Sequence, residues 1–130
     1  MKEVLEFLKE CQTFYLATCE DGQPRVRPFG AVAEYEGNLY IATNNKKNVF
    51  KQLLANPKFE ISGMSKGKWI RLEGTAVHDD RLSAREKMLE ENPSLSGMYS
   101  ANDGLMEVLY IKDATATICS FTEEPTVIKF

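Results

Sequence analysis

The sequence predicts a mainly β domain of the α+β class, an antiparallel barrel of about six strands with short flanking helices. Two observations favour this fold. Short segments of alternating apolar and polar residues, separated by turn residues, fill most of the chain, and the segments with helical spacing are short. Closing such a small sheet into a barrel would remove its exposed strand edges.

The first half of the chain begins with apolar residues at helical spacing, which predicts a helix over residues 2–11. Three successive antiparallel strands are expected to follow, over residues 14–19, 24–34 and 39–43. A second helix is then expected to start near Lys47 and to end before Pro57, because the residue before a proline avoids helical dihedral angles.

The second half continues the pattern with a hairpin over residues 58–64 and 68–78. Asp79 and Asp80 are candidate N-caps for a helix over residues 81–91. The remaining expected segments are a loop over 94–104, a long strand over 105–121 that is broken at Lys112 and Asp113, and an edge strand over 126–129.

Composition limits the class of protein. A chain of 130 residues with 43% hydrophobic content predicts a single domain, residues 1–130, with a real core. The net charge of −3 and a pI near 5.3 argue against binding to nucleic acid or to anionic membranes. No apolar run approaches the ~20 residues of a membrane span or the apolar stretch of a signal peptide. With three cysteines that lack metal-ligand spacing, this predicts a cytoplasmic protein with reduced thiols.

Several catalytic patterns are absent. His78 is the only histidine, so a metal site with several histidine ligands is excluded and no metal site is expected. At the end of a strand, His78 is interpreted as structural or solvated. The chain has no G-x-G-x-x-G, P-loop or H-E-x-x-H pattern, so an enzyme built on this sequence would rely on a cofactor for the difficult chemistry.

The connection into the second helix is the most informative segment. Lys46 and Lys47 stand at the start of the helix, where the partial positive charge of the N-terminus favours Asp or Glu. An external anion such as a phosphate would explain both cations, with side-chain donors from Thr43, Asn44 and Asn45 around it. The alternative is a solvated lysine pair in a loop.

Two strands are expected to carry unusual outer faces. In the strand that contains Trp69, the residues Ile70, Leu72, Gly74 and Ala76 form an inward set, which places the only tryptophan outside. Another subunit, a flat ligand or a helix of the same chain would then cover it.

In the second expected strand, Arg25, Arg27 and Phe29 share one face, which predicts a basic and aromatic outer stripe. Pro28 cannot donate to a β ladder, so the strand should be bulged or unpaired at that point. Arg27 should reach the same anion as Lys47 if successive strands lie side by side.

Three segments, residues 22–30, 37–47 and 53–57, resemble the pyridoxamine 5′-phosphate oxidase-like family of FMN-binding split-barrel proteins. The similarity is greatest to short, stand-alone bacterial members, and it extends to residues 69–74 and 113–117. The resemblance implies a six-stranded Greek-key split β-barrel that forms a homodimer. It also implies two FMN molecules in clefts at the subunit interface.

The resemblance implies that Arg27, Pro28 and Phe29 lie along the flavin, and that Thr43, Asn44 and Lys47 hold the ribityl-phosphate end. Asn48 stands where fuller members carry an arginine on the phosphate, and Lys46 is the residue that would compensate. Ser62 and Gly63 would approach the cofactor from the side, and Trp69 would come from the partner subunit. The cofactor-binding residues expected in this way are Arg27, Pro28, Phe29, Thr43, Asn44, Asn45, Lys46, Lys47, Asn48, Ser62, Gly63 and Trp69.

The expected activity is that of an FMN-dependent oxidoreductase, which passes electrons from a nicotinamide or similar donor to a small acceptor. True pyridoxamine phosphate oxidases carry substrate-binding Arg and His residues in a longer C-terminal region, and residues 120–130 contain no equivalent. Vitamin B6 oxidation is therefore not expected. One alternative is a non-catalytic module that stores or senses flavin or another flat ligand such as haem, and another is a structural dimer without a cofactor.

Overall fold

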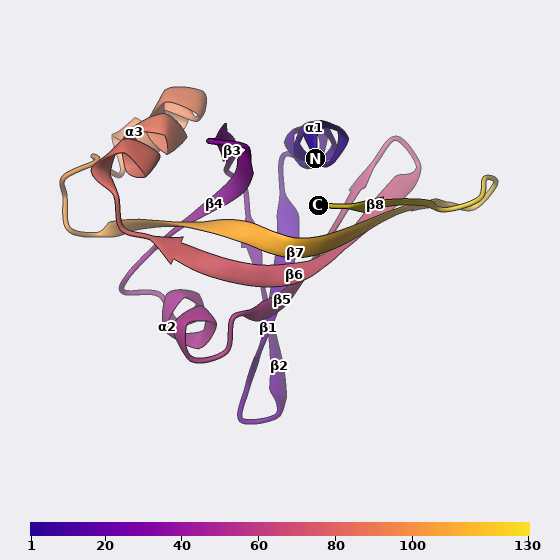
Figure 1. The fold of residues 1–130 in the computed structure, drawn as a ribbon, viewed down its shortest axis with the longest axis horizontal. Helices are drawn as coiled ribbons and strands as arrows, with labels where there is room; N and C mark the ends of the chain where they lie inside the picture. Colours follow the sequence, from indigo (N-terminus) through magenta and orange to yellow (C-terminus); the bar gives the residue numbers. More distant parts are fainter.

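The computed structural model describes residues 1–130 as one antiparallel sheet of eight strands with three α-helices and a short 3-10 helix (Figure 1). The elements of the first half are α1 (Lys2–Cys11), β1 (Phe14–Glu20), β2 (Gln23–Phe29), β3 (Val32–Tyr35), β4 (Asn38–Asn44) and α2 (Asn48–Ala55). Those of the second half are β5 (Lys58–Ser65), β6 (Lys68–Asp79), α3 (Leu82–Glu91), the 3-10 helix η1 (Pro93–Gly97), β7 (Met106–Ser120) and β8 (Thr126–Lys129). None of the helices is long and apolar enough to cross a membrane.

The long strand expected over residues 24–34 is divided in the structure. It breaks at Gly30 and Ala31, so that β2 pairs with β1 while β3 pairs with β4. The expected antiparallel pairings with the preceding and following strands, β1 and β4, are present, but they belong to separate halves of the segment, so β4 lies beside β7 and β3 and not beside β2. Because of this two-residue break, the two halves of one chain segment form the strands at opposite ends of the sheet, β2 and β3.

The strands follow the order β2-β1-β5-β6-β7-β4-β3, with β8 paired to β7. The sheet thus has eight strands rather than the expected six, and no ladder joins β2 to β3. Its two end strands are instead connected covalently through Gly30 and Ala31. The expected antiparallel, mainly β architecture with short helices is confirmed, whereas hydrogen bonding does not close the sheet into a barrel.

Two apolar clusters form the core. The larger cluster joins the sheet to helices α1 and α2, and the smaller joins the sheet to α3. Strand β4 contributes to both, because Leu39 and Ile41 face the larger cluster and Tyr40 faces the smaller. Burial on both faces therefore fixes the position of β4 and of the residues that follow it.

The predicted hairpin of β5 and β6 and the edge strand β8 are confirmed. In β6, Ile70, Leu72 and Ala76 are buried as expected, and the pairing with β7 shifts between Glu73 and Thr75. The long strand β7 is continuous through the expected break, where Asp113 adopts a φ of 51°. The 8-, 12- and 15-residue strands β5, β6 and β7 form the long curved centre of the molecule (Figure 1).

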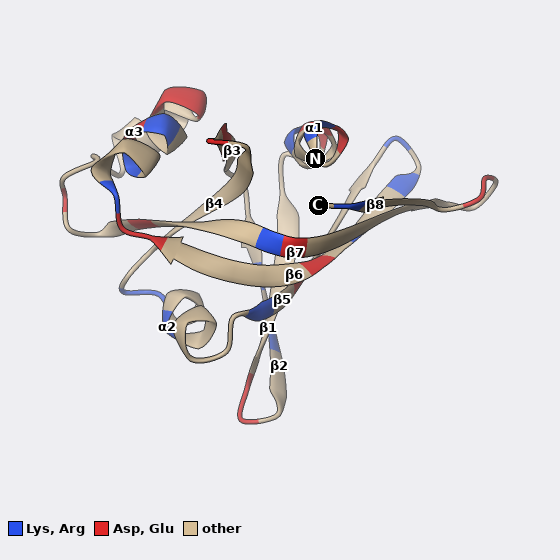
Figure 2. Ribbon diagram, in the orientation of Figure 1, with Lys and Arg blue, Asp and Glu red and all other residues tan.

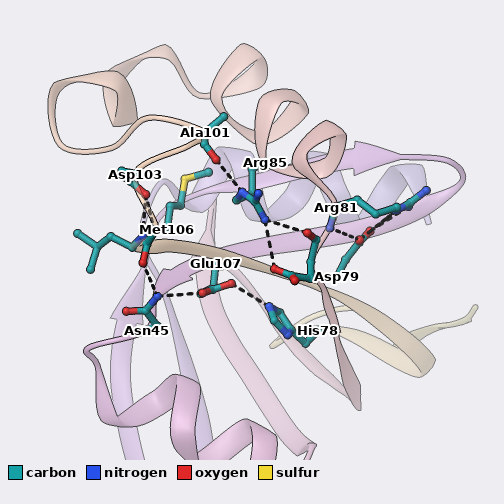
Figure 3. Close-up of polar contacts among 12 residues, drawn as sticks. Asn45, His78, Asp79, Arg81, Arg85, Ala101, Asp103, Met106 and Glu107 are labelled. Carbon is teal, nitrogen blue, oxygen red and sulfur yellow. Dashed lines mark hydrogen bonds and ion pairs between the residues drawn. The ribbon is translucent and has the colours of Figure 1, made fainter.

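Asp79 is not the cap of α3, contrary to expectation. The cap position is Arg81 and it has no side-chain cap. Asp79 is the buried last residue of β6, and its carboxylate accepts a hydrogen bond from the Tyr40 hydroxyl at 2.6 Å. It also accepts one from the Arg81 guanidinium at 2.9 Å (Figure 3). Arg81 also donates to Glu36 at 2.9 Å. Through these hydrogen bonds, the Asp79 carboxylate connects the end of β6 to Tyr40 of β4 and to Arg81 at the start of α3.

Candidate functional site

A cleft of about 340 Å³ lies beside the connection between β2 and β3, where the two ends of the sheet meet. One wall comes from β2 and the end of β4, and the other from the segment that follows α3. The lining residues are Arg27, Pro28, Phe29, Gly30, Ala31, Ala42, Thr43, Lys47, Val49, Asn92, Ser94, Leu95, Met98 and Tyr99. Half of them are hydrophobic, as is typical of a site for a small organic ligand.

A wider, more open hollow of about 680 Å³ adjoins this cleft and shares Arg27, Pro28, Lys47 and Val49 with it. Lys46 and Asn48 line only the open hollow. Figure 2 shows the basic residues at the connection between β4 and α2, which borders the hollow. The two spaces together form one site with an apolar end and a basic end.

Arg27 does not lie on an outer stripe as expected. Phe29, on the same face of β2, is buried and packs against Phe14 with ring centroids 6.2 Å apart. The Arg27 guanidinium lies half-buried and donates to the carbonyl of Leu16 at 3.2 Å and to the Thr18 hydroxyl at 2.9 Å. This end of the face turns inward because Phe29 belongs to the larger core cluster.

Burial lowers the pKa of the Arg27 guanidinium, and the nearby charge of Arg25 acts in the same direction, whereas the charge of Glu20 acts against them. The group remains a cation. Its hydrogen-bond partners in the chain are uncharged oxygens, which include Oε1 of Gln52 at 2.6 Å. A partly desolvated cation with neutral partners is stabilised by an anion, so Arg27 is oriented to receive one.

The other two cations of the site also lack acidic partners. Lys46 and Lys47 take part in none of the ion pairs of the chain, whereas Arg25, at the rim, lies 3.9 Å from Glu20. Lys47 is the N-cap residue of α2, which has no side-chain cap and no acid in its first turn. The first N–H groups of this helix are therefore free to bind an anion, as the sequence predicts.

Thr43 carries the one buried side-chain polar atom of the chain that has no hydrogen-bond partner. The residue is 5% exposed and lines the cleft. A buried hydroxyl without a partner costs about 1–3 kcal/mol. A ligand in the cleft with a polar atom near Thr43 would give this hydroxyl its missing hydrogen-bond partner.

Pro28 is neither bulged nor unpaired, contrary to expectation, because it lies opposite Tyr15 in a regular ladder. Strand β2 is the end strand of the sheet, so its other edge has no partner strand that would need the missing N–H. Pro28 lines both parts of the site.

The two asparagines before the lysines bind within the chain. Asn44 accepts from the backbone N–H of Lys46 at 3.0 Å and donates to the Tyr99 hydroxyl at 2.7 Å. Asn45 donates to the carbonyl of Gly104 at 2.8 Å and to the Glu107 carboxylate at 3.0 Å (Figure 3). Neither lines the cleft or the hollow, and both shape the turn that presents the lysines.

Ser62, Gly63 and Trp69 do not line the cleft within one chain. Gly63 faces α1, and an added Cβ would lie 3.0 Å from the sulfur of Cys11. Ser62 lies on the opposite face of β5, which is exposed. Trp69 points outward as predicted and packs on Phe121 with ring centroids 5.0 Å apart, rather than under a helix.

His78 lies outside the cleft and donates or accepts a hydrogen bond of 2.8 Å with Glu107, as Figure 3 shows. Its ring also contacts Phe50 edge-on, with centroids 5.1 Å apart. Asp80 brings a carboxylate oxygen, as a third possible ligand atom, within 4.8 Å of those of His78 and Glu107. The contacts with Glu107 and Phe50 fit the structural interpretation of His78.

The wall that follows α3, which includes Tyr99, and the contribution of Gln52 were not found from the sequence. Gln52 is 6% exposed on the core-facing side of α2, between Val49 and Leu53, and a polar residue at that helical position was the signal available. Tyr99 follows η1 in a segment expected to be a loop, where no periodicity marks it.

The cleft offers cations, hydroxyls and amides, and no Asp, Glu, Cys or His lines it. Such a set can bind and orient an anionic, partly flat ligand, and it lacks a conventional nucleophile or carboxylate base. Any demanding chemistry in the cleft therefore requires a cofactor.

Comparison with known proteins agrees with the fold. A NimC/NimA family protein from Clostridium acetobutylicum shares 59% sequence identity and a TM-score of 0.93, over 98% of this chain and 93% of that one. General stress protein 26 from Bacillus anthracis has 18% identity and a TM-score of 0.78, over 99% and 97% of the two chains. A FAD-binding protein from Mesorhizobium loti has 19% identity and a TM-score of 0.62, over 92% and 94%. No curated protein matches the sequence significantly.

The family model described as pyridoxamine 5′-phosphate oxidase matches residues 1–108, which is most of the chain. This match and the relative from Clostridium acetobutylicum confirm the resemblance predicted from the sequence. The chain therefore belongs to the pyridoxamine 5′-phosphate oxidase family.

Proposed function

We propose that this protein binds FMN in the cleft and acts as an oxidoreductase that passes electrons from a nicotinamide or similar donor to a small acceptor. The observation that carries the proposal is the group of three cations, Arg27, Lys46 and Lys47, which line the joined spaces and take part in no ion pair. The one acid in the open hollow, Glu20, lies beside Arg25. The orphaned Thr43 hydroxyl supports a ligand that also offers a polar atom to the interior. The name of the FAD-binding relative from Mesorhizobium loti makes flavin the first candidate.

In this proposal the phosphate lies at the basic end, near Arg27, Lys47 and the N-terminus of α2. A charge-assisted contact of this kind contributes ~1.5–3 kcal/mol. The flat part of the ligand occupies the apolar end, with Thr43 as a hydrogen-bond partner. FMN would supply hydride or electron transfer, which the residues of the cleft do not provide. Arg27 and Lys47 place fixed positive charge beside the site, which favours negative charge that develops on a bound ligand.

We also propose that two copies pair through the outer face of β1, β5, β6, β7 and β8. Directly paired residues share a face, and the register places Tyr15 opposite Ser62, Met64 opposite Trp69, and Val127 opposite Thr117. Four apolar residues on or beside this face are more than half exposed: Tyr15, Met64, Phe121 and Val127. Burial of such a patch favours association. A cytoplasmic location is part of the same proposal.

A visible absorption spectrum of the purified protein, before and after FMN addition and gel filtration, tests cofactor binding. We expect about one FMN per chain and at least 10-fold weaker binding by the Lys47→Ala variant. Lys51→Ala is the matched control, because Lys51 is exposed on the same helix and lines neither part of the site. No retained flavin, or equal affinity in both variants, contradicts the proposed site.

The absence of an acid, base or nucleophile from the cleft also favours a second candidate, a non-catalytic module that stores or senses flavin. Its haem version has less support, because the only histidine lies outside the cleft. Anaerobic reduction of bound FMN by NADH or NADPH separates the candidates. Reduction faster than that of free FMN supports the oxidoreductase, and a tightly bound flavin that no donor reduces faster supports the module. Light scattering during gel filtration tests the dimer. Trp69→Asp should yield monomers, and Lys51→Asp, at an exposed position on α2 and away from this face, is the control.

A further inference from the structure

The segment between α3 and β7 forms one wall of the cleft and is anchored along its length. Asn92 donates to the carbonyl of Val32 at 2.9 Å, which fixes its start to β3. The Asp103 carboxylate accepts backbone N–H groups at its end, including that of Met106 at 2.9 Å. Between them, Arg85 donates to the carbonyl of Ala101 at 2.7 Å (Figure 3). Tyr99 is therefore held in place on a wall with several anchors.

The side chain of Asn44 faces Tyr99 in one orientation only. The backbone N–H of Lys46 is always a donor, and it lies 3.0 Å from one terminal atom of the Asn44 amide. That atom must be the oxygen, so the NH2 group is the one that lies 2.7 Å from the Tyr99 hydroxyl. Asn44 therefore donates, and the oxygen of Tyr99 accepts.

Because the Tyr99 oxygen accepts in this bond, its hydroxyl proton has no acceptor within the chain. The Tyr99 hydroxyl makes no other hydrogen bond in the chain, and the residue lines the cleft. We propose that Tyr99 donates a hydrogen bond from this hydroxyl to an uncharged oxygen or nitrogen acceptor of the ligand in the cleft, and that Asn44 is its positioning residue.

The neighbours of Tyr99 indicate which part of the ligand it meets. Leu95 and Met98 line the cleft beside it and are absent from the open hollow, whereas Arg27 and Lys47 line both spaces. The acceptor therefore belongs to the uncharged, flat part of a ligand whose anionic group lies at the basic end. This inference rests on the proposed function, under which the acceptor is a carbonyl oxygen or ring nitrogen of the flavin.

Binding of FMN and of riboflavin, which lacks the phosphate, tests the inference. We expect Tyr99→Phe to weaken both ligands to a similar degree, by roughly 10-fold, and to shift the visible absorption bands of the bound flavin. Lys47→Ala should weaken FMN alone. Tyr110→Phe is the matched control, because the Tyr110 hydroxyl lies outside the cleft. Wild-type affinity and an unshifted spectrum in Tyr99→Phe would overturn the inference while the proposed function stands.

Asn44→Asp gives a second test that keeps the Tyr99 side chain. A carboxylate at position 44 accepts the Tyr99 proton and so removes the donor from the cleft. Riboflavin binding should fall in Asn44→Asp to the level of Tyr99→Phe, and the same change in the Tyr99→Phe background should have little further effect. Equal losses from Asn44→Asp in both backgrounds would contradict the role of Asn44. A wild-type protein that binds neither flavin overturns the proposed function and this inference together.

Discussion

Arg27 donates a hydrogen bond of 2.6 Å from Nη2 to Oε1 of Gln52, and this contact joins the cation of the cleft to the core-facing side of α2. Gln52 also accepts from the Thr18 hydroxyl, and Thr18 accepts from Arg27. The three side chains form a closed polar group at the edge of the core. The cation is thus oriented before any ligand arrives, which reduces the entropy lost on binding.

Replacement of Arg27 by Gln should weaken FMN binding by at least 10-fold, because it removes the least solvated cation of the site. Isothermal titration measures the affinity. Arg25→Gln is the matched control, since Arg25 is exposed at the rim and lies near Glu20, and it should change the affinity less than 3-fold. Similar affinities of the two variants for FMN would contradict a specific contact between Arg27 and the anion.

Replacement of Gln52 by Ala should lower the free energy of unfolding by about 1–2 kcal/mol, because it leaves the buried Thr18 hydroxyl without its acceptor. The affinity for FMN should fall less than in the Arg27 variant, since the cation remains but is less well oriented. Urea unfolding and FMN titration give the two values. Lys51→Ala, one residue earlier on α2, should change neither quantity, and an unchanged Gln52→Ala protein would contradict the positioning role.

Replacement of Thr43 by Val should separate stability from ligand binding. The Thr43 hydroxyl has no partner in the chain, so its removal should leave the ligand-free protein equally stable or stabilise it by up to about 1 kcal/mol. FMN affinity should fall, because the ligand loses a hydrogen bond. Thr18→Val provides the contrast, since the bonded Thr18 hydroxyl should be costly to remove. Unchanged affinity in Thr43→Val would exclude contact between this hydroxyl and the flavin.

Stability should depend on the ionisation of Asp79 in acid. The Arg81 guanidinium and the Tyr40 hydroxyl oppose the effect of burial and hold the pKa of Asp79 at about 2, below the ordinary 3.8. A lowered pKa stabilises the folded state above the unfolded value, so this contribution is complete above about pH 4 and is lost as the pH falls from 4 towards 2. Since Arg81 is half-exposed, we expect about 1–2 kcal/mol.

Urea unfolding between pH 5 and pH 2 measures this effect. The Asp79→Asn variant should be less stable than the wild type at pH 5, and the difference should shrink as the pH approaches 2. Glu36→Gln is the control, because Glu36 binds the same arginine from an exposed position. A difference between Asp79→Asn and the wild type that stays constant with pH would contradict the assigned pKa.

Replacement of Gly63 by Ala should lower the free energy of unfolding by about 1–2 kcal/mol, because the new Cβ would lie 3.0 Å from the Cys11 sulfur and 3.2 Å from Phe14 Cβ. Gly97→Ala is the control, since an added Cβ there meets no atom within 4 Å. Thermal unfolding compares the two variants. Equal melting temperatures would show that α1 shifts to accommodate the methyl group.

Local sequence pattern was sufficient to predict most of the helices and strands and the basic end of the site. Helical spacing predicted α1, alternation and turn residues predicted the hairpin of β5 and β6, and the uncompensated lysines predicted an anion site at the start of α2. The division of the second strand was not predicted, because Val32 continues the alternation of β2 and only pairing with β4 reveals the break. The prediction that Asp79 caps α3 was wrong, because an Asp just before a helix looks the same in the sequence whether it caps the helix or is buried at the end of the preceding strand.

By itself the sequence determined the antiparallel, mainly β class, the position of the lysines and the outward direction of Trp69, since these depend on periodicities and helix ends within a few residues. Only the tertiary structure decided that Arg27 turns inward to Gln52, that Thr43 lacks a partner and that Tyr99 lines the same cleft. Each of these depends on which distant strands and loops meet. The order of strands in the sheet determines which of these residues meet. That order depends on long-range strand pairing and burial, which outweigh the local conformational preferences of the residues.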